Sequence, residues 1–126
     1  MKRFWKFVYI FWPSVLRAYE TFFHHHRQDF LIGHLAAQKI TEDLERHLAM
    51  NGFERAIIAL KDPGEILDMR KREGEEFQYH IRLFNDREIR THYEYAPEAH
   101  LVTHCFNVCQ EKKETYFKEL LNEYLA

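Results

Sequence analysis

The chain has 126 residues, of which 46% are hydrophobic and 30% charged, and its formal net charge is −2 at pH 7. This composition is typical of one folded α+β or similar globular domain and excludes a disordered chain. The single serine, Ser14, argues against a serine-nucleophile hydrolase, and the four glycines do not form a phosphate-binding loop.

Residues 1–12 are predicted to form an arm rich in aromatic and basic side chains. Residues 1–27 hold five lysines or arginines against one glutamate, a local formal charge of +4. The apolar run within this arm, residues 7–12, is far shorter than the ~20 residues that span a bilayer. Because aromatic side chains dominate protein interfaces, we expect this arm to contribute to a homodimer; an interfacial membrane anchor is the alternative. The expected interface residues here are Phe4, Trp5, Phe7 and Phe11.

Two helices are predicted in residues 13–52. From Pro13 onward, apolar residues recur at spacings of three and four as far as Phe30, and Gly33 interrupts this pattern. A second helix then places Leu35, Ile40, Leu44 and Leu48 on its inner side. We expect it to end at Asn51-Gly52, since both residues tolerate the left-handed conformation of a helix C-terminus.

A four-stranded antiparallel meander is predicted in residues 53–95. After Gly52 the apolar period changes from about 3.6 to 2, and turn sequences separate the runs. The expected strands are 54–61, 65–72, 76–84 and 88–95, with turns at 62–64, 73–75 and 85–87. Short turns between successive strands imply antiparallel pairing.

The turns and the apolar pattern together predict a register for this sheet. Residues paired across antiparallel strands point to the same face, so the inner pairs must all be apolar. The expected inner pairs are Leu60–Leu67, Ile58–Met69, Met69–Tyr79, Leu67–Ile81, Leu83–Ile89, Ile81–Thr91 and Tyr79–Tyr93.

The other face is then polar, and we expect it to be exposed. One row across it reads Asp68, His80, His92, and a neighbouring row contains Arg82 beside Arg90. A solvated sheet face is the plain interpretation. The sharper interpretation is a site for an anionic ligand or for nucleic acid, because arginines bind phosphate through fixed pairs of donors. The residues proposed for that site are Asp68, Arg70, His80, Arg82, Arg90 and His92, with Ile57 and Phe84 as apolar interface positions on the same face.

A helix or helix pair is predicted for residues 97–126, beginning near Pro97 and packing on one face of the sheet. Within it, His100 and His104 are four residues apart, as are Cys105 and Cys109. Such spacing can place two ligands beside a metal ion, but the two pairs are offset by about 100° on a helix. We therefore expect no metal and no cofactor, with a site at these four residues as the alternative.

The whole chain, 1–126, is thus predicted to be one α+β domain: two N-terminal helices, a four-stranded antiparallel meander, and a C-terminal helical segment. The expected function is that of a small non-enzymatic interaction protein, cytoplasmic because it has only two cysteines, and homodimeric. The first alternative is a metal-independent phosphodiester-cleaving enzyme, with His80 and His92 as acid and base and Asp68 orienting His80. The second alternative is a peripheral membrane protein held by its N-terminal aromatic segment.

Overall fold

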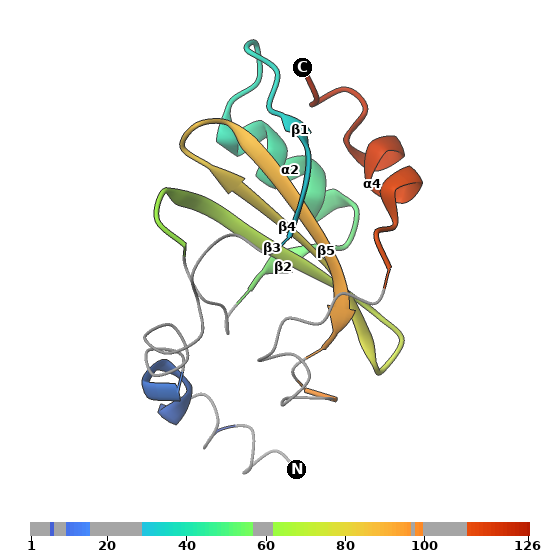
Figure 1. Cartoon of the computed structure of the whole chain (residues 1–126). Coiled ribbons are helices and arrows are strands. Elements are labelled where there is room, and N and C mark those ends of the chain that lie inside the picture. Colours follow the sequence, from blue (N-terminus) through green and yellow to red (C-terminus); the bar gives the residue numbers. More distant parts are fainter. Residues whose placement is uncertain (1–5, 7–9, 16–28, 57–61, 97, 100–110) are drawn as a thin grey trace.

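A five-stranded antiparallel sheet, with strand order β1-β5-β4-β3-β2, forms the centre of the fold. The computed structural model describes residues 6, 10–15, 29–56, 62–96, 98–99 and 111–126. The strands are β1 (Phe30–His34), β2 (Glu54–Arg55), β3 (Glu65–Glu73), β4 (Phe77–Phe84) and β5 (Glu88–Tyr95), and the helices named in Figure 1 are α2 (Thr41–Met50) and α4 (Glu114–Leu121). The predicted α+β class with an antiparallel sheet is therefore confirmed.

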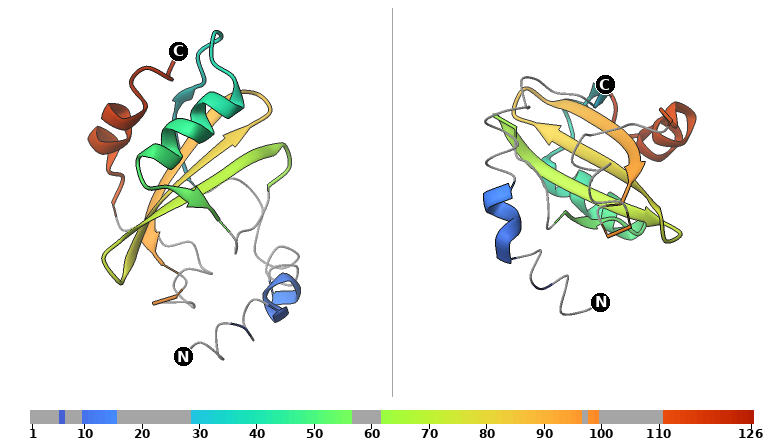
Figure 2. Two further views of the ribbon diagram at one scale, coloured as in Figure 1. Left: turned by 180° about the vertical axis from the view of Figure 1, so that it is seen from behind. Right: turned by 60° about the horizontal axis from the view of Figure 1, so that its bottom comes forward.

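Both named helices lie against the same face of the sheet, which we call the inner face. In the left view of Figure 2, which shows the molecule from behind, α2 lies in front of the strands and crosses them. The helical residues 10–15 lie at the opposite end of the molecule. Leu44 and Leu48 of α2 and Phe117 and Leu121 of α4 are fully buried. Each such side chain contributes about 1.5–3 kcal/mol by leaving water. The strand residues of this core are Leu67, Met69, Tyr79, Ile81, Leu83, Ile89 and Tyr93, which are the predicted inner residues of β3, β4 and β5.

The hairpin of β4 and β5 has the predicted register. Leu83 pairs with Ile89, Ile81 with Thr91 and Tyr79 with Tyr93. The connecting loop is 85–87, as expected, and Arg87 adopts a φ of 72° there. The Arg87 side chain also donates to the carbonyl oxygens of Leu35, Ala36 and Lys39 at 3.0, 2.5 and 2.8 Å, so this loop fixes the segment before α2.

The predicted pairing of β3 with β4 is wrong by two residues. Met69 pairs with Ile81 rather than Tyr79, because the loop spans 74–76 instead of 73–75. A shift of two keeps every side chain on its predicted face, since the side-chain period of a strand is two. The shift changes which residues of the outer face are paired across the two strands. His80 lies opposite Arg70, and Asp68 lies opposite Arg82.

The predicted pairing of β2 with β3 is also wrong. Met69 pairs with Arg55, not Ile58, because β2 ends at Arg55 as described and the Pro63-Gly64 turn by itself does not set the register of this strand. The turn itself is present: the Glu65 amide donates to the Asp62 carbonyl at 3.1 Å, and Gly64 has a φ of 83°. The predicted partners Ile58 and Leu60 lie outside the described residues.

The N-terminal helix prediction fails at its end, where a fifth strand replaces it. Phe30–His34 forms β1, which pairs with β5 at the edge of the sheet. A short apolar run fits a helix or a strand equally well, and pairing with β5 decided between them. Leu35 is likewise not helical; it forms a bridge with Leu125, and α2 begins only at Thr41. The predicted end of α2 before Asn51-Gly52 is confirmed.

Candidate functional site

The predicted site residues lie on the outer face of the sheet, but that face is buried rather than exposed. Arg82, His92 and Glu94 are 7%, 2% and 1% exposed. Phe84, predicted as an exposed interface residue, is 0% exposed, and the Arg82 guanidinium lies 5.4 Å from the centre of its ring. Charged groups are buried in proteins when they are paired. We use the name outer-face cluster for the polar side chains gathered here: Asp29, Asp62, Glu65, Asp68, Gln78, His80, Arg82, His92 and Glu94.

Arg82 is the cation of one half of this cluster. Its Nε donates to Asp29 Oδ2 at 2.7 Å, and its Nη1 donates to Asp62 Oδ2 at 2.9 Å. A longer contact of 3.4 Å joins Nη1 to Glu65 Oε2. Burial alone would lower the pKa of Arg82, but the charges of these carboxylates outweigh it and raise the pKa. Arg82 therefore joins three segments that are far apart in the chain.

Glu65 reaches the outer face because of a β-bulge. Between Glu65 and Leu67 the register shifts, so Glu65 lies opposite Phe84 and Leu67 opposite Leu83. One extra residue, Ile66, reverses the side-chain alternation and turns Glu65 outward. Burial, together with the neighbouring Asp68 carboxylate, raises the pKa of Glu65 to about 8. The site therefore favours the protonated form of Glu65 over the ionised form.

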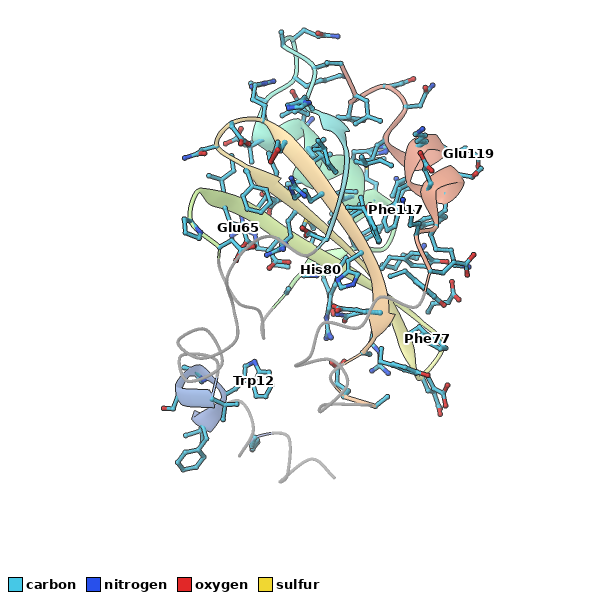
Figure 3. The ribbon with its side chains drawn as sticks, in the orientation of Figure 1. Trp12, Glu65, Phe77, His80, Phe117 and Glu119 are labelled. Carbon is cyan, nitrogen blue, oxygen red and sulfur yellow. The ribbon has the colours of Figure 1, made fainter. Side chains whose placement is uncertain are left out.

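His80 forms the second half of the cluster together with Asp68. Its Nε2 is hydrogen-bonded to Asp68 Oδ1, and its Nδ1 lies 3.6 Å from Glu94 Oε1. Burial lowers the pKa of an imidazole, but the charge of Asp68 and the hydrogen bond to it prevail and raise the pKa of His80 to about 9. Both ring nitrogens of this imidazole, whose position is labelled in Figure 3, therefore face carboxylate oxygens within the chain.

His92 lies directly opposite His80 on the neighbouring strand, as predicted. Its Nδ1 is 3.4 Å from Glu94 Oε2, whereas its buried Nε2 has no hydrogen-bond partner. Burial lowers the pKa of His92, and the nearby positive charges of His80 and Arg82 add to this effect, which Glu94 and Asp29 oppose. The two paired histidines thus differ in charge at pH 7: His80 is protonated and His92 is neutral.

The remaining arginines of the predicted site are paired as well. Arg70 donates to Glu98 Oε1 at 2.5 Å and to Gln78 Oε1 at 3.2 Å. Arg90 lies beside Arg82 as predicted, and it donates to the backbone carbonyl of Asp29 at 3.0 Å and to Glu88 at 3.3 Å. An anion at this face would therefore compete with carboxylates and carbonyls that already accept from these guanidinium groups.

Several predicted site residues lie outside the described residues, namely Phe4, Trp5, Phe7, Ile57, His100, His104, Cys105 and Cys109. Phe11 is described and is 51% exposed. Within the described part of the chain, no group of three or more histidine, cysteine or acidic side chains is arranged to hold a metal ion. The helices of that same part are all too short or too polar to cross a bilayer.

Sequence reasoning missed the carboxylates that neutralise the outer face. Asp29 precedes β1, Asp62 lies in a turn, Glu65 is turned outward by a bulge, and Glu98 follows β5. None of these positions follows from strand alternation, and the only available signal was the excess of basic residues on the predicted face. No family model, curated protein or solved structure matches the chain.

Proposed function

We propose that this chain is a non-enzymatic interaction protein that pairs with a second copy of itself through the apolar surface of helical residues 10–15. The observation that carries the proposal is the exposure of three apolar side chains there: Ile10 is 71%, Phe11 51% and Val15 47% exposed. Trp12, which lies on the same helical segment and is labelled in Figure 3, is only 5% exposed. Exposed apolar side chains gathered on one surface commonly mark a site of association with a partner.

Charge supports a second copy as the partner. Residues 1–27 carry a formal charge of +4, and the whole chain carries −2, so residues 28–126 carry −6. The basic end of one copy is therefore complementary to the acidic body of another. Complementary charge steers association and selects the partner, while the apolar contact supplies most of the affinity.

The test is the oligomeric state, measured by light scattering after gel filtration at several protein concentrations. We expect the wild type to be a dimer and Phe11→Glu to shift it toward monomer by at least tenfold in the dissociation constant. Met50→Glu is the matched control, because Met50 is 81% exposed at the far end of α2 and should leave the dimer intact. A wild type that remains monomeric at high concentration contradicts the proposal.

Two alternative partners are outcomes of the same experiment. Binding of the wild type, but not of Phe11→Glu, to vesicles containing anionic lipid would assign the apolar surface to a membrane instead. Binding to RNA that is lost on raising the salt concentration would restore the anionic-ligand hypothesis. We favour neither, because the outer-face arginines are already paired within the chain.

The enzyme hypothesis has one observation in its favour. His80 and His92 lie directly opposite each other on neighbouring strands, and their surroundings raise the pKa of His80 and lower the pKa of His92, as an acid–base pair requires. Against it, the proton that His80 would give to a substrate is engaged by Asp68. Incubation with single-stranded RNA and EDTA from pH 5 to 8 tests it, and cleavage lost in His92→Ala would establish the activity. We expect no cleavage.

A further inference from the structure

His92 is enclosed by charged groups from three parts of the chain. Glu94 lies on the same strand, with its Oε2 3.4 Å from Nδ1. His80 lies directly opposite on β4, and the charges of Arg82 on β4 and Asp29 before β1 act on the ring as well. The side chain is 2% exposed, and the second ring nitrogen, Nε2, has no hydrogen-bond partner.

This geometry assigns the neutral ring to one tautomer. Because Nδ1 is the ring nitrogen nearest to a carboxylate, at 3.4 Å from Glu94 Oε2, we assign the proton of the neutral ring to Nδ1, which leaves the lone pair on Nε2. A buried polar atom without a partner costs free energy, and the cost is larger when the group is charged. Protonation of Nε2 would create an unpaired charged donor directly opposite His80.

We propose that His92 makes the outer face of the sheet acid-sensitive, because protonation of its buried ring places a second imidazolium directly opposite His80. Both ring nitrogens of His80 already face carboxylates, those of Asp68 and Glu94, so Glu94 would have to serve two cations. The inference goes beyond the proposed self-association, because it applies equally to a monomer and to a dimer.

The expected direction follows from proton linkage. Burial lowers the pKa of His92 below 6.5, its ordinary value, so the unfolded chain binds this proton more readily than the folded chain. Stability from this group is therefore present above pH 6.5 and decreases as the pH falls toward the folded pKa. In that window the unfolding equilibrium constant rises by up to about tenfold per pH unit.

The experiment compares the full-length wild type with His92→Gln and with His34→Gln as a matched control. His34 is exposed on β1, so its replacement should preserve the acid-side dependence of the unfolding constant. We expect the unfolding constant of His92→Gln to rise less steeply than that of the wild type as the pH falls below 6.5. Amide hydrogen exchange on β5 around His92 should accelerate on acidification in the wild type and not in His92→Gln.

A second measurement keeps the inference testable if His92→Gln fails to fold. NMR titration of the wild-type histidine rings should show the ring of His92 taking up its proton below pH 6.5, with the Nδ1–H tautomer above it. Titration of His92 at or above pH 6.5 would overturn the proposal. An unchanged acid-side slope in a folded His92→Gln variant, or the same loss in His34→Gln, would overturn it as well.

Discussion

The two faces of the sheet are both buried, but they are stabilised by different interactions. On the inner face, side chains such as Leu83 and Ile89 pack beneath α2 and α4. On the outer face, Arg82 and His80 are held by carboxylates from β3, β5 and the connecting segments. Apolar burial is insensitive to pH, whereas a buried charge network depends on the protonation of each member.

The comparison shows how neighbouring residues of one strand serve different purposes. Leu83 belongs to a core that accepts other apolar side chains of similar volume. Arg82, the residue before it, donates from Nε to Asp29 and from Nη1 to Asp62, so its position is set by two directed contacts. Desolvation offsets much of the energy of such a network, so its contribution lies in fixing which segments come together.

The largest expected change in stability comes from replacing Arg82, and its dependence on pH should distinguish Arg82 from Leu83. We expect Arg82→Met to destabilise the protein by about 3–5 kcal/mol at pH 7, because it leaves buried carboxylates without their cation. The loss should diminish toward pH 4, where carboxylates left without a cation take up protons. Urea unfolding monitored by circular dichroism at pH 4, 5.5 and 7 measures both values.

Leu83→Ala is the matched variant on the other face. A cavity in the core should cost about 2–5 kcal/mol, and that cost should be the same at all three pH values. If the two variants showed the same dependence on pH, the distinction between an apolar and a charged face would be wrong.

An intermediate effect is expected at Glu65. Since the pKa of Glu65 is about 8 in the folded state and 4.5 ordinarily, the folded chain retains a proton that the unfolded chain releases. Wild-type stability from this group therefore decreases as the pH rises from 4.5 to about 8, by at most about 1.4 kcal/mol per pH unit. Glu65→Gln mimics the protonated form and should be more stable than the wild type at pH 9.

Glu75→Gln is the control for that experiment, since Glu75 is exposed in the loop between β3 and β4. Glu75→Gln should leave the decrease in folding stability with rising pH unchanged. Equal slopes for the wild type and Glu65→Gln would show that Glu65 is ionised throughout and that the outer face holds one more negative charge than we infer.

The smallest expected effect lies at the edge of the inner face, where Glu73 accepts hydrogen bonds from two phenols. Tyr93 donates to it at 2.7 Å and Tyr79 donates to its other oxygen. Burial and Glu73 together raise the pKa of Tyr93 to about 12. Glu73→Gln should lower that value and cost about 1 kcal/mol or less, because Glu73 is exposed.

Ultraviolet titration of the tyrosines between pH 9 and 12.5 measures this change, and Glu76→Gln in the adjacent loop is the control. Two tyrosines should ionise earlier in Glu73→Gln than in the wild type. Identical titration curves would mean that the two phenols donate elsewhere, and that this corner of the inner face is purely apolar.

Local patterns were sufficient where the interactions are local. The loop 85–87 follows β4 at once, so its length alone fixed the pairing of His80 with His92 and of Arg82 with Arg90. The predicted register between β3 and β4 was wrong by two residues. Such a shift leaves the inside–outside alternation unchanged, and the turn residues did not specify where the loop begins and ends. β1 was missed because an apolar run as short as residues 30–32 has no period that distinguishes a strand from a helix.

By itself, the sequence determined the class of fold, the inner face of β3, β4 and β5, and the presence of histidines and arginines on the other face. Only the tertiary structure decided that this other face is buried and that its charges are paired. The partners of Arg82 come from positions 53 and 20 residues away and from a side chain turned by a bulge. Burial and ion pairing depend on distances between remote segments, and periodicity along the chain carries no information about those distances.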